Sequence, residues 1–88
     1  MSLSVDSDQS WLRKELARRM STAREGARVT QVELAKRMKT TQPFIARLES
    51  GRELPSTRTL ARYAVAVGRR LSIEFKDAQD STRRGKND

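Results

Sequence analysis

Two threonines place the tightest limit on how this chain can fold, because each stands where a helix would begin. Thr30 opens the sequence Thr-Gln-Val-Glu, a capping box in which the threonine hydroxyl accepts from a first-turn amide and Glu33 reaches back to the cap. Thr41 repeats the N-cap signal, and Pro43 is tolerated after it because first-turn amides have no partner within the helix. Gly51 then stops the second helix. The segment therefore predicts two short helices joined by a turn of about three residues.

Apolar residues at three- and four-residue spacing predict a further helix on either side of this pair. The first is expected from about Ser10 to Ala23 or a little beyond, with Gly26 marking its end. The other is expected to open at Pro55-Ser56 and to end at Gly68. The inward faces of all these helices would be formed by Leu12, Leu16, Met20, Ala23, Leu34, Ala35, Met38, Ile45, Leu48, Leu60, Tyr63, Ala64 and Val67. The core is therefore expected to be helical.

The residues from Leu71 to Lys76 alternate apolar and polar side chains, which predicts one short strand. Leu71, Ile73 and Phe75 would face inward, over the preceding helix. An isolated strand is not stable in water, and the sequence holds no second strand pattern. We therefore expect a homodimer in which this strand pairs antiparallel with its copy across a two-fold axis. There are two alternatives: the dimer forms through the preceding helix, or the strand pairs with a different protein.

The composition limits the chemistry that the chain can perform. Its 88 residues suffice for one domain, expected at residues 10–76 between a flexible N-terminus (1–9) and a disordered basic tail (77–88). There is no cysteine and no histidine, so we expect neither an enzyme nor a bound metal or cofactor. No apolar run approaches the roughly 20 residues of a membrane span, and the polar, acidic stretch from Met1 to Ser10 does not have the pattern of a signal peptide. A cytoplasmic location is therefore expected.

The charge of the chain and the outward face of the second short helix both point to nucleic acid. Lys and Arg number 19 against 11 Asp and Glu, a formal charge of +8 that favours a polyanionic partner, although a solvated basic surface would give the same count. On a helical wheel the outward face carries Pro43, Ala46, Arg47 and Ser50, with Gln42 at its exposed end. Gln and Arg can pair bidentately with adenine and guanine in the major groove. A DNA-reading helix-turn-helix is predicted, the alternative being an ordinary helical hairpin.

The segment from Val29 to Gly51 resembles the XRE family, the Cro and phage-repressor type of helix-turn-helix, and the likeness extends over roughly Leu16 to Phe75. The family pattern is Thr-Gln-x-x-Leu-Ala, a turn, and a second helix ending in Arg-(Ile/Leu)-Glu-x-Gly. The matching residues here are Thr30, Gln31, Leu34, Ala35, Arg47, Leu48, Glu49 and Gly51, with Pro55 following at the usual distance. Lys39 departs from the pattern, because the family usually has glycine at this turn. The resemblance implies an all-α, four- to five-helix, lambda-repressor-like DNA-binding domain, here with one short C-terminal strand that pairs in a dimer.

The same resemblance implies roles for individual residues. Those that would face base edges are Thr41, Gln42, Pro43 and Arg47. Those that would contact phosphates are Gln31, Lys39, Thr40 and Arg52. Arg24 and Glu49 would form an internal ion pair that fixes the second helix without touching DNA. Phe44, at the border of the core face, is expected to pack against the core, the alternative being a contact to the DNA backbone.

A narrower likeness covers the stretch from Arg62 to Phe75, which resembles the HigA-like and HipB-like antitoxins of type II toxin–antitoxin modules. It implies a repressor of its own operon that binds an inverted-repeat operator in double-stranded DNA as a homodimer and neutralises a cognate toxin protein. The two recognition helices of such a dimer would lie about 34 Å apart, one turn of DNA. A stand-alone XRE regulator, such as a phage repressor or restriction-modification controller, and an adaptor that binds only proteins are the alternatives.

Overall fold

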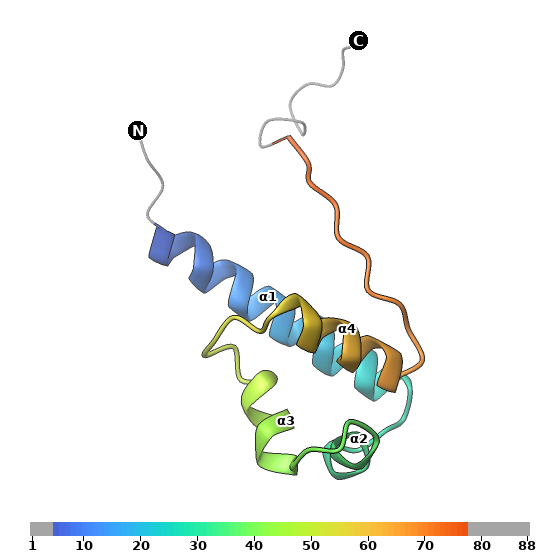
Figure 1. Ribbon diagram of the computed structural model, residues 1–88. Coiled ribbons are helices and arrows are strands. Elements are labelled where there is room, and N and C mark those ends of the chain that lie inside the picture. The colour runs from blue at the N-terminus through green and yellow to red at the C-terminus, as the bar shows by residue number, and fades with distance from the viewer. Residues whose placement is uncertain (1–4, 78–88) are drawn as a thin grey trace.

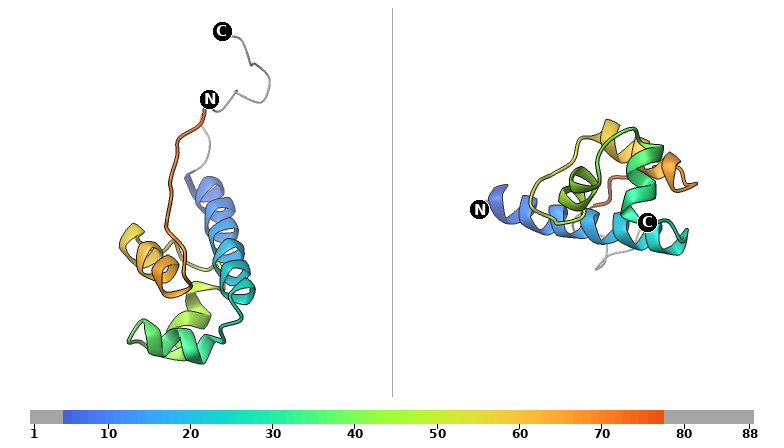
Figure 2. Two further views of the ribbon diagram at one scale, coloured as in Figure 1. Left: turned by 90° about the vertical axis from the view of Figure 1, so that its right-hand side faces the viewer. Right: turned by 90° about the horizontal axis from the view of Figure 1, so that it is seen from below.

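The computed structural model describes residues 5–77, and within them the fold is all-helical (Figure 1). Its four helices are α1 (Val5–Gly26), α2 (Gln31–Arg37), α3 (Gln42–Leu48) and α4 (Thr57–Ala66). Helix α4 packs along α1, and α2 and α3 pack on each other below that pair, as Figure 1 and the views in Figure 2 show. The predicted helical fold is therefore present, with the two short helices adjacent in space.

One hydrophobic core joins all four helices. Its largest fully buried side chains are Tyr63, Leu34 and Ile45, which come from α4, α2 and α3. Leu16, Ala23, Phe44, Ala66 and Leu71 pack against it from the edge. The buried cluster consists of Met20, Val29, Leu34, Ala35, Met38, Ile45, Leu48, Leu60, Tyr63 and Val67. The short helices are thus held mainly by tertiary packing, since isolated helices of this length are not stable in water.

The first helix of the predicted domain begins earlier than expected. Helix α1 begins at Val5 rather than near Ser10, so residues 5–9, expected to belong to a flexible N-terminus, are helical. The physical reason is that the sequence between Val5 and Ser10 contains neither glycine nor proline, the residues that most strongly stop a helix. Residues 1–4, and 78–88 of the predicted basic tail, lie outside the described residues.

The segment from Leu71 to Lys76 is not a strand in this single chain, and no strand occurs among residues 5–77. Leu71 packs against the core, whereas Ile73 is 59% exposed and Phe75 98% exposed. The expectation that all three face inward over α4 is therefore wrong for Ile73 and Phe75 within one chain. The backbone instead runs away from the helices (Figures 1 and 2). A strand requires a second strand beside it, so the pairing with another copy stays a prediction.

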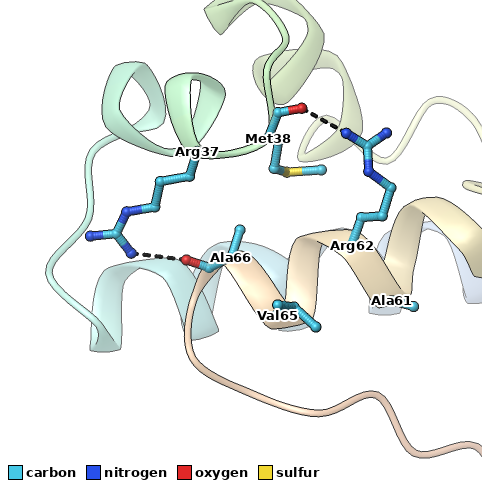
Figure 3. Close-up of a pocket in the computed structure, with 6 residues that line it drawn as sticks. All are labelled: Arg37, Met38, Ala61, Arg62, Val65 and Ala66. Carbon is cyan, nitrogen blue, oxygen red and sulfur yellow. Dashed lines mark hydrogen bonds between the residues drawn. The ribbon is translucent and has the colours of Figure 1, made fainter.

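Two arginines tie α2 to α4 by capping each other's helix ends (Figure 3). Arg37 of α2 donates to the carbonyl of Ala66 at the end of α4 (2.9 Å), and Arg62 of α4 donates to the carbonyl of Met38 at the end of α2 (2.7 Å). The last carbonyls of a helix have no partner within it, so these bonds satisfy groups that would otherwise be left to water. Between them lies an open hollow of about 380 Å³ lined by Arg37, Met38, Ala61, Arg62, Val65 and Ala66.

The turn between α2 and α3 is a Schellman motif built on a lysine. The amide of Thr40 donates to the carbonyl of Ala35 (2.8 Å) and that of Lys39 to Lys36 (3.1 Å), the two bonds that define this helix ending. Lys39 takes the left-handed position with φ of 57°. A side chain disfavours this region by about 1–2 kcal/mol relative to the right-handed one. The lysine that departs from the XRE pattern thus occupies the position where glycine would be unstrained.

Replacing Lys39 by glycine is expected to stabilise the fold. Relief of the left-handed strain is partly offset because glycine gives the unfolded chain more freedom, so the free energy of unfolding should rise by about 0.5–1 kcal/mol. Lys39→Ala is the matched control, because it removes the same charge but keeps the Cβ atom that causes the strain. Urea denaturation of the two variants measures the difference. Equal stabilities would show that the turn carries no strain at this residue.

Candidate nucleic-acid interface

The two N-caps predicted from the sequence fix where α2 and α3 begin. The hydroxyl of Thr30 accepts from the amide of Glu33 (3.0 Å), and that of Thr41 accepts from the amide of Phe44 (3.2 Å). The reciprocal half of the capping box is different, because the carboxylate of Glu33 lies 3.3 Å from Arg37, one turn further along α2. The hydroxyl caps are thus as predicted, and the acid serves an i,i+4 ion pair instead.

The residues expected to face bases gather at α3. Thr41, Pro43 and Arg47 are exposed, whereas Gln42 is only half-exposed. On the opposite side of the same helix Ile45 is fully buried. Helix α3 therefore presents one polar face outward while its other face anchors it in the core.

The residues expected to contact phosphates lie at the borders of this face. Gln31 is the first residue of α2 and is half-buried. Lys39 and Thr40 form the turn that precedes α3, the lysine being exposed and the threonine half-exposed. Arg52 is exposed in the loop that follows α3. Both chain segments that flank α3 thus carry an exposed basic side chain.

Gln31, predicted to contact a phosphate, links α3 to a buried carboxylate. Its Nε2 donates to Oε1 of Glu49 (3.0 Å), and its Oε1 accepts from Nε2 of Gln42 (2.7 Å). A carboxylate can only accept, so the amide of Gln31 must turn its NH2 group toward Glu49 and its oxygen toward Gln42. The orientation of the Gln42 side chain is therefore set from inside the protein. The sequence gives no signal for this link, because the three residues come together only when the chain is folded.

Glu49 is the centre of this network and is buried, with 6% of its side chain exposed. Arg24 of α1 binds it in a fork, Nε to Oε2 at 2.8 Å and Nη2 to Oε1 at 2.9 Å. The third nitrogen of that guanidinium, Nη1, donates to the carbonyl of Val29 (2.9 Å). The hydroxyl of Tyr63 lies 2.5 Å from Oε2 of Glu49 and 2.8 Å from the carbonyl of Met20, within donating distance of both. All four helices thus supply a partner to the network.

The hydrogen bonds to Glu49 decide its charge state. Burial by itself raises the pKa of the Glu49 carboxyl, but the bonds from Arg24, Tyr63 and Gln31 outweigh burial and hold the pKa below its ordinary value. Burial and the neighbouring carboxylate both raise the pKa of the Tyr63 hydroxyl, which therefore keeps its proton and serves as a donor. The carboxylate is thus negative at neutral pH and fully engaged with donors.

Arg47 is held on the surface by two neighbours that the sequence analysis did not connect with it. Its Nε lies 3.0 Å from Oε2 of Glu53, and its guanidinium carbon lies 5.8 Å from the centre of the Phe44 ring. Phe44 packs against the core, as expected, and also lies beneath this cation. Arg47 and Glu53 are both 58% exposed, so their ion pair is in contact with water.

The described part of the chain carries neither a metal-binding cluster nor a membrane-spanning helix. Among residues 5–77, no group of histidine, cysteine, aspartate and glutamate side chains is placed to hold a metal ion. None of the helices described there combines the length and apolar character needed to cross a bilayer.

Comparison with known proteins decides the family. A family model described as a helix-turn-helix domain matches residues 15–71, which includes α2, α3 and α4. The chain is also 32% identical over 60 residues to the ImmF control region 10 kDa protein of Bacillus phage phi105, covering 68% of this chain and 67% of that protein. The chain belongs to the helix-turn-helix domain family. No solved structure matches it. The matched residues contain the whole Glu49 network and the exposed face of α3, so this helix-turn-helix family is matched over the part of the chain where the candidate interface lies.

Removing the arginine from the buried pair is expected to destabilise the helix-turn-helix domain strongly. Arg24→Met keeps the length of the side chain but leaves the Glu49 carboxylate buried with neutral donors only, so the free energy of unfolding should fall by about 3–5 kcal/mol. Arg18→Met is the control, because Arg18 pairs with Glu15 at 2.7 Å while 62% exposed, and it should lose less than about 1 kcal/mol. Chemical denaturation compares them. Similar small losses in both variants would contradict the buried character of the Arg24 pair.

Proposed function

We propose that this protein is a sequence-specific DNA-binding transcription regulator that inserts α3 into the major groove. The observation that carries the proposal is the state of Gln42: a polar side chain at the exposed start of α3 is fixed by an internal chain of hydrogen bonds through Gln31 to Glu49. A merely structural hairpin has no need to orient an amide at its surface, whereas base recognition gains directly from a fixed donor and acceptor.

The orientation of Gln42 matches adenine. One hydrogen of its NH2 group is engaged by Gln31, which leaves the second hydrogen and the amide oxygen for a ligand. Adenine presents an acceptor at N7 and a donor at N6 in the major groove, the complement of one NH and one oxygen. Beside it, Pro43 offers an apolar surface for a thymine methyl, and Arg47 offers paired donors for the O6 and N7 atoms of guanine. Thr41 at the N-cap completes the proposed set of base-facing side chains.

Phosphates on either side of the groove are the proposed partners of Gln31, Lys39, Thr40 and Arg52. The exposed charges of Lys39 and Arg52 lie on the segments before and after α3, where the two phosphate backbones of the groove would pass. The net charge of +8 adds a sequence-independent attraction, which predicts that binding weakens steeply with salt.

We propose that the DNA-bound form is a homodimer on an inverted repeat. Ile73 and Phe75 are 59% and 98% exposed in the single chain, and pairing of their segment with its copy would put them on one face of a ribbon that can pack over the helices and leave water. Val65 of α4, 72% exposed, supports the alternative interface through that helix. Either dimer would present two copies of α3 to one face of the DNA.

Between the kinds of regulator considered, the matched phage protein favours a stand-alone, phage-type control protein, because its name places it in a control region. The antitoxin interpretation rests on the likeness of residues 62–75 and predicts a toxin bound to this chain. Co-purification of the chain with the products of neighbouring genes separates the two: a stable small partner supports an antitoxin, and a homodimer alone supports the stand-alone regulator.

Substitutions in the Gln42–Gln31 pair are expected to alter sequence preference at one base pair. Gln42→Ala should lose about 1–3 kcal/mol of discrimination there. Gln31→Ala should lose part of the same discrimination, because Gln42 is then no longer oriented, in addition to a general loss from the missing phosphate contact. Binding to a randomised DNA library measures both effects.

Gln9→Ala is the control for this experiment, because Gln9 is an exposed amide in α1, outside the helix-turn-helix. Its preferences should equal those of the wild type. If Gln42→Ala bound every library sequence with unchanged relative affinity, α3 would not be the base-reading element and the proposal would be wrong.

A pair of surface variants is expected to locate the dimer interface. Phe75→Ser should shift the chain toward monomer, because it removes the most exposed aromatic ring from the proposed strand pairing, while the fold of one chain, to which that ring contributes almost nothing, stays intact. Val65→Ser makes a comparable change on α4 and should leave the dimer unaffected. Sedimentation velocity over a concentration series measures both. The reverse result would assign the interface to α4.

A further inference from the structure

We propose that Glu53 is a specificity-determining residue that positions Arg47 for base recognition and weakens its engagement with non-cognate DNA. The inference rests on the proposed function, since it concerns how α3 chooses among sequences. It starts from the contact between the two side chains, which is made by Nε of Arg47 and Oε2 of Glu53 at 3.0 Å. The guanidinium nitrogen nearest to the carboxylate is therefore Nε, not either Nη group.

The geometry of this contact leaves the recognition edge of the guanidinium open. A guanidinium offers five N–H donors in a fixed planar fork. Glu53 lies nearest to the Nε side, so the Nη groups at the far end of the fork can face the paired acceptors of guanine. The Phe44 ring, 5.8 Å below, supports the face of the same plane. Arg47 is thus restrained on one edge and one face, and its unrestrained edge carries the donors that base readout requires.

The loop after α3 is built to hold Glu53 beside Arg47. The Ser50 hydroxyl donates to the carbonyl of Arg47 (2.7 Å) and accepts from the amide of Arg52 (3.2 Å), which folds the loop back over the helix end. Gly51 makes the fold possible with φ of 78°, and a Cβ there would meet the Cα of Lys14 at 3.5 Å. The loop is therefore hydrogen-bonded back to α3 and passes close to α1. These loop contacts fix the position of Glu53 more than its own weak ion pair with Arg47 does.

A carboxylate at this place affects cognate and non-cognate DNA differently. Without Glu53, the flexible arginine could swing to any nearby phosphate, a contact that carries no sequence information. With Glu53, a phosphate contact must break the ion pair and bring the phosphate close to a negative charge, whereas a guanine contact through the Nη groups can leave the pair in place. The pair is exposed and therefore weak, so its influence on binding is moderate.

The test is Glu53→Gln, which removes the charge and keeps the side-chain size. The ratio of affinities for the selected operator and for a scrambled duplex should fall by about two- to fivefold, mainly because non-specific binding tightens. Glu33→Gln is the matched control: it makes the same charge change and breaks another exposed ion pair, with Arg37 at 3.3 Å, away from the exposed face of α3. In an Arg47→Ala background, Glu53→Gln should leave the ratio unchanged.

A measurement without DNA separates positioning from a general charge effect. Relaxation of the ¹⁵Nε–H group of Arg47 should show greater motion in Glu53→Gln than in the wild type, with the melting temperature unchanged. An unchanged affinity ratio, a ratio that falls equally in Glu33→Gln, or unchanged motion of Arg47 would each overturn the proposal while leaving DNA reading by α3 intact. A wild-type protein that prefers no duplex over its scrambled counterpart would instead overturn the proposed function, and the role of Glu53 with it.

Discussion

The rest of the structure depends on one buried carboxylate, that of Glu49 at the end of α3. A charge in this position is destabilising unless its oxygens are matched by donors, and the donors come from three other helices: Arg24, Gln31 and Tyr63. The requirement to satisfy Glu49 therefore fixes how α3 lies against α1, α2 and α4 more narrowly than apolar packing would. Because a carboxylate only accepts, it also sets the direction of the amide chain that runs out to Gln42.

Much of this arrangement was predictable because its causes are local or periodic. In the caps at Thr30 and Thr41, the hydroxyl accepts a hydrogen bond from the amide three residues later. Because the two groups are so close in the chain, the sequence alone predicts these caps. The buried face of each helix follows from three- and four-residue spacing. The family likeness marked Lys39 only as a departure from glycine, and the left-handed backbone of Lys39 is consistent with glycine being usual at that turn. The Arg24–Glu49 contact was suggested by the likeness, since no spacing rule links those residues.

What could not be predicted depends on the path of the chain in space or on a second molecule. The place of Gln31 between Glu49 and Gln42 arises only once α2 and α3 pack together, so the sequence carries no signal for the bond that orients Gln42. Glu53 reaches Arg47 because the intervening loop folds back through Gly51, a geometry that a helical wheel does not contain. The start of α1 at Val5 was missed because the apolar spacing used to predict this helix begins only at Leu12. The segment after Leu71 can become a strand only beside a partner strand, which one chain does not supply.

Gln42 at the start of α3 is held more firmly than Arg47 near its end, and the difference follows from their charge. Gln42 is neutral, so an internal, partly buried hydrogen-bond chain can fix it without leaving a charge unpaired when DNA departs. Arg47 is a cation, and burying it as firmly would require a second deeply desolvated ion pair, whose desolvation offsets much of its attraction. A solvent-exposed acid and an aromatic face restrain it at little energetic cost and release it readily. The domain thus uses its strong buried pair to place the helix and its weak exposed pair to tune one side chain on it.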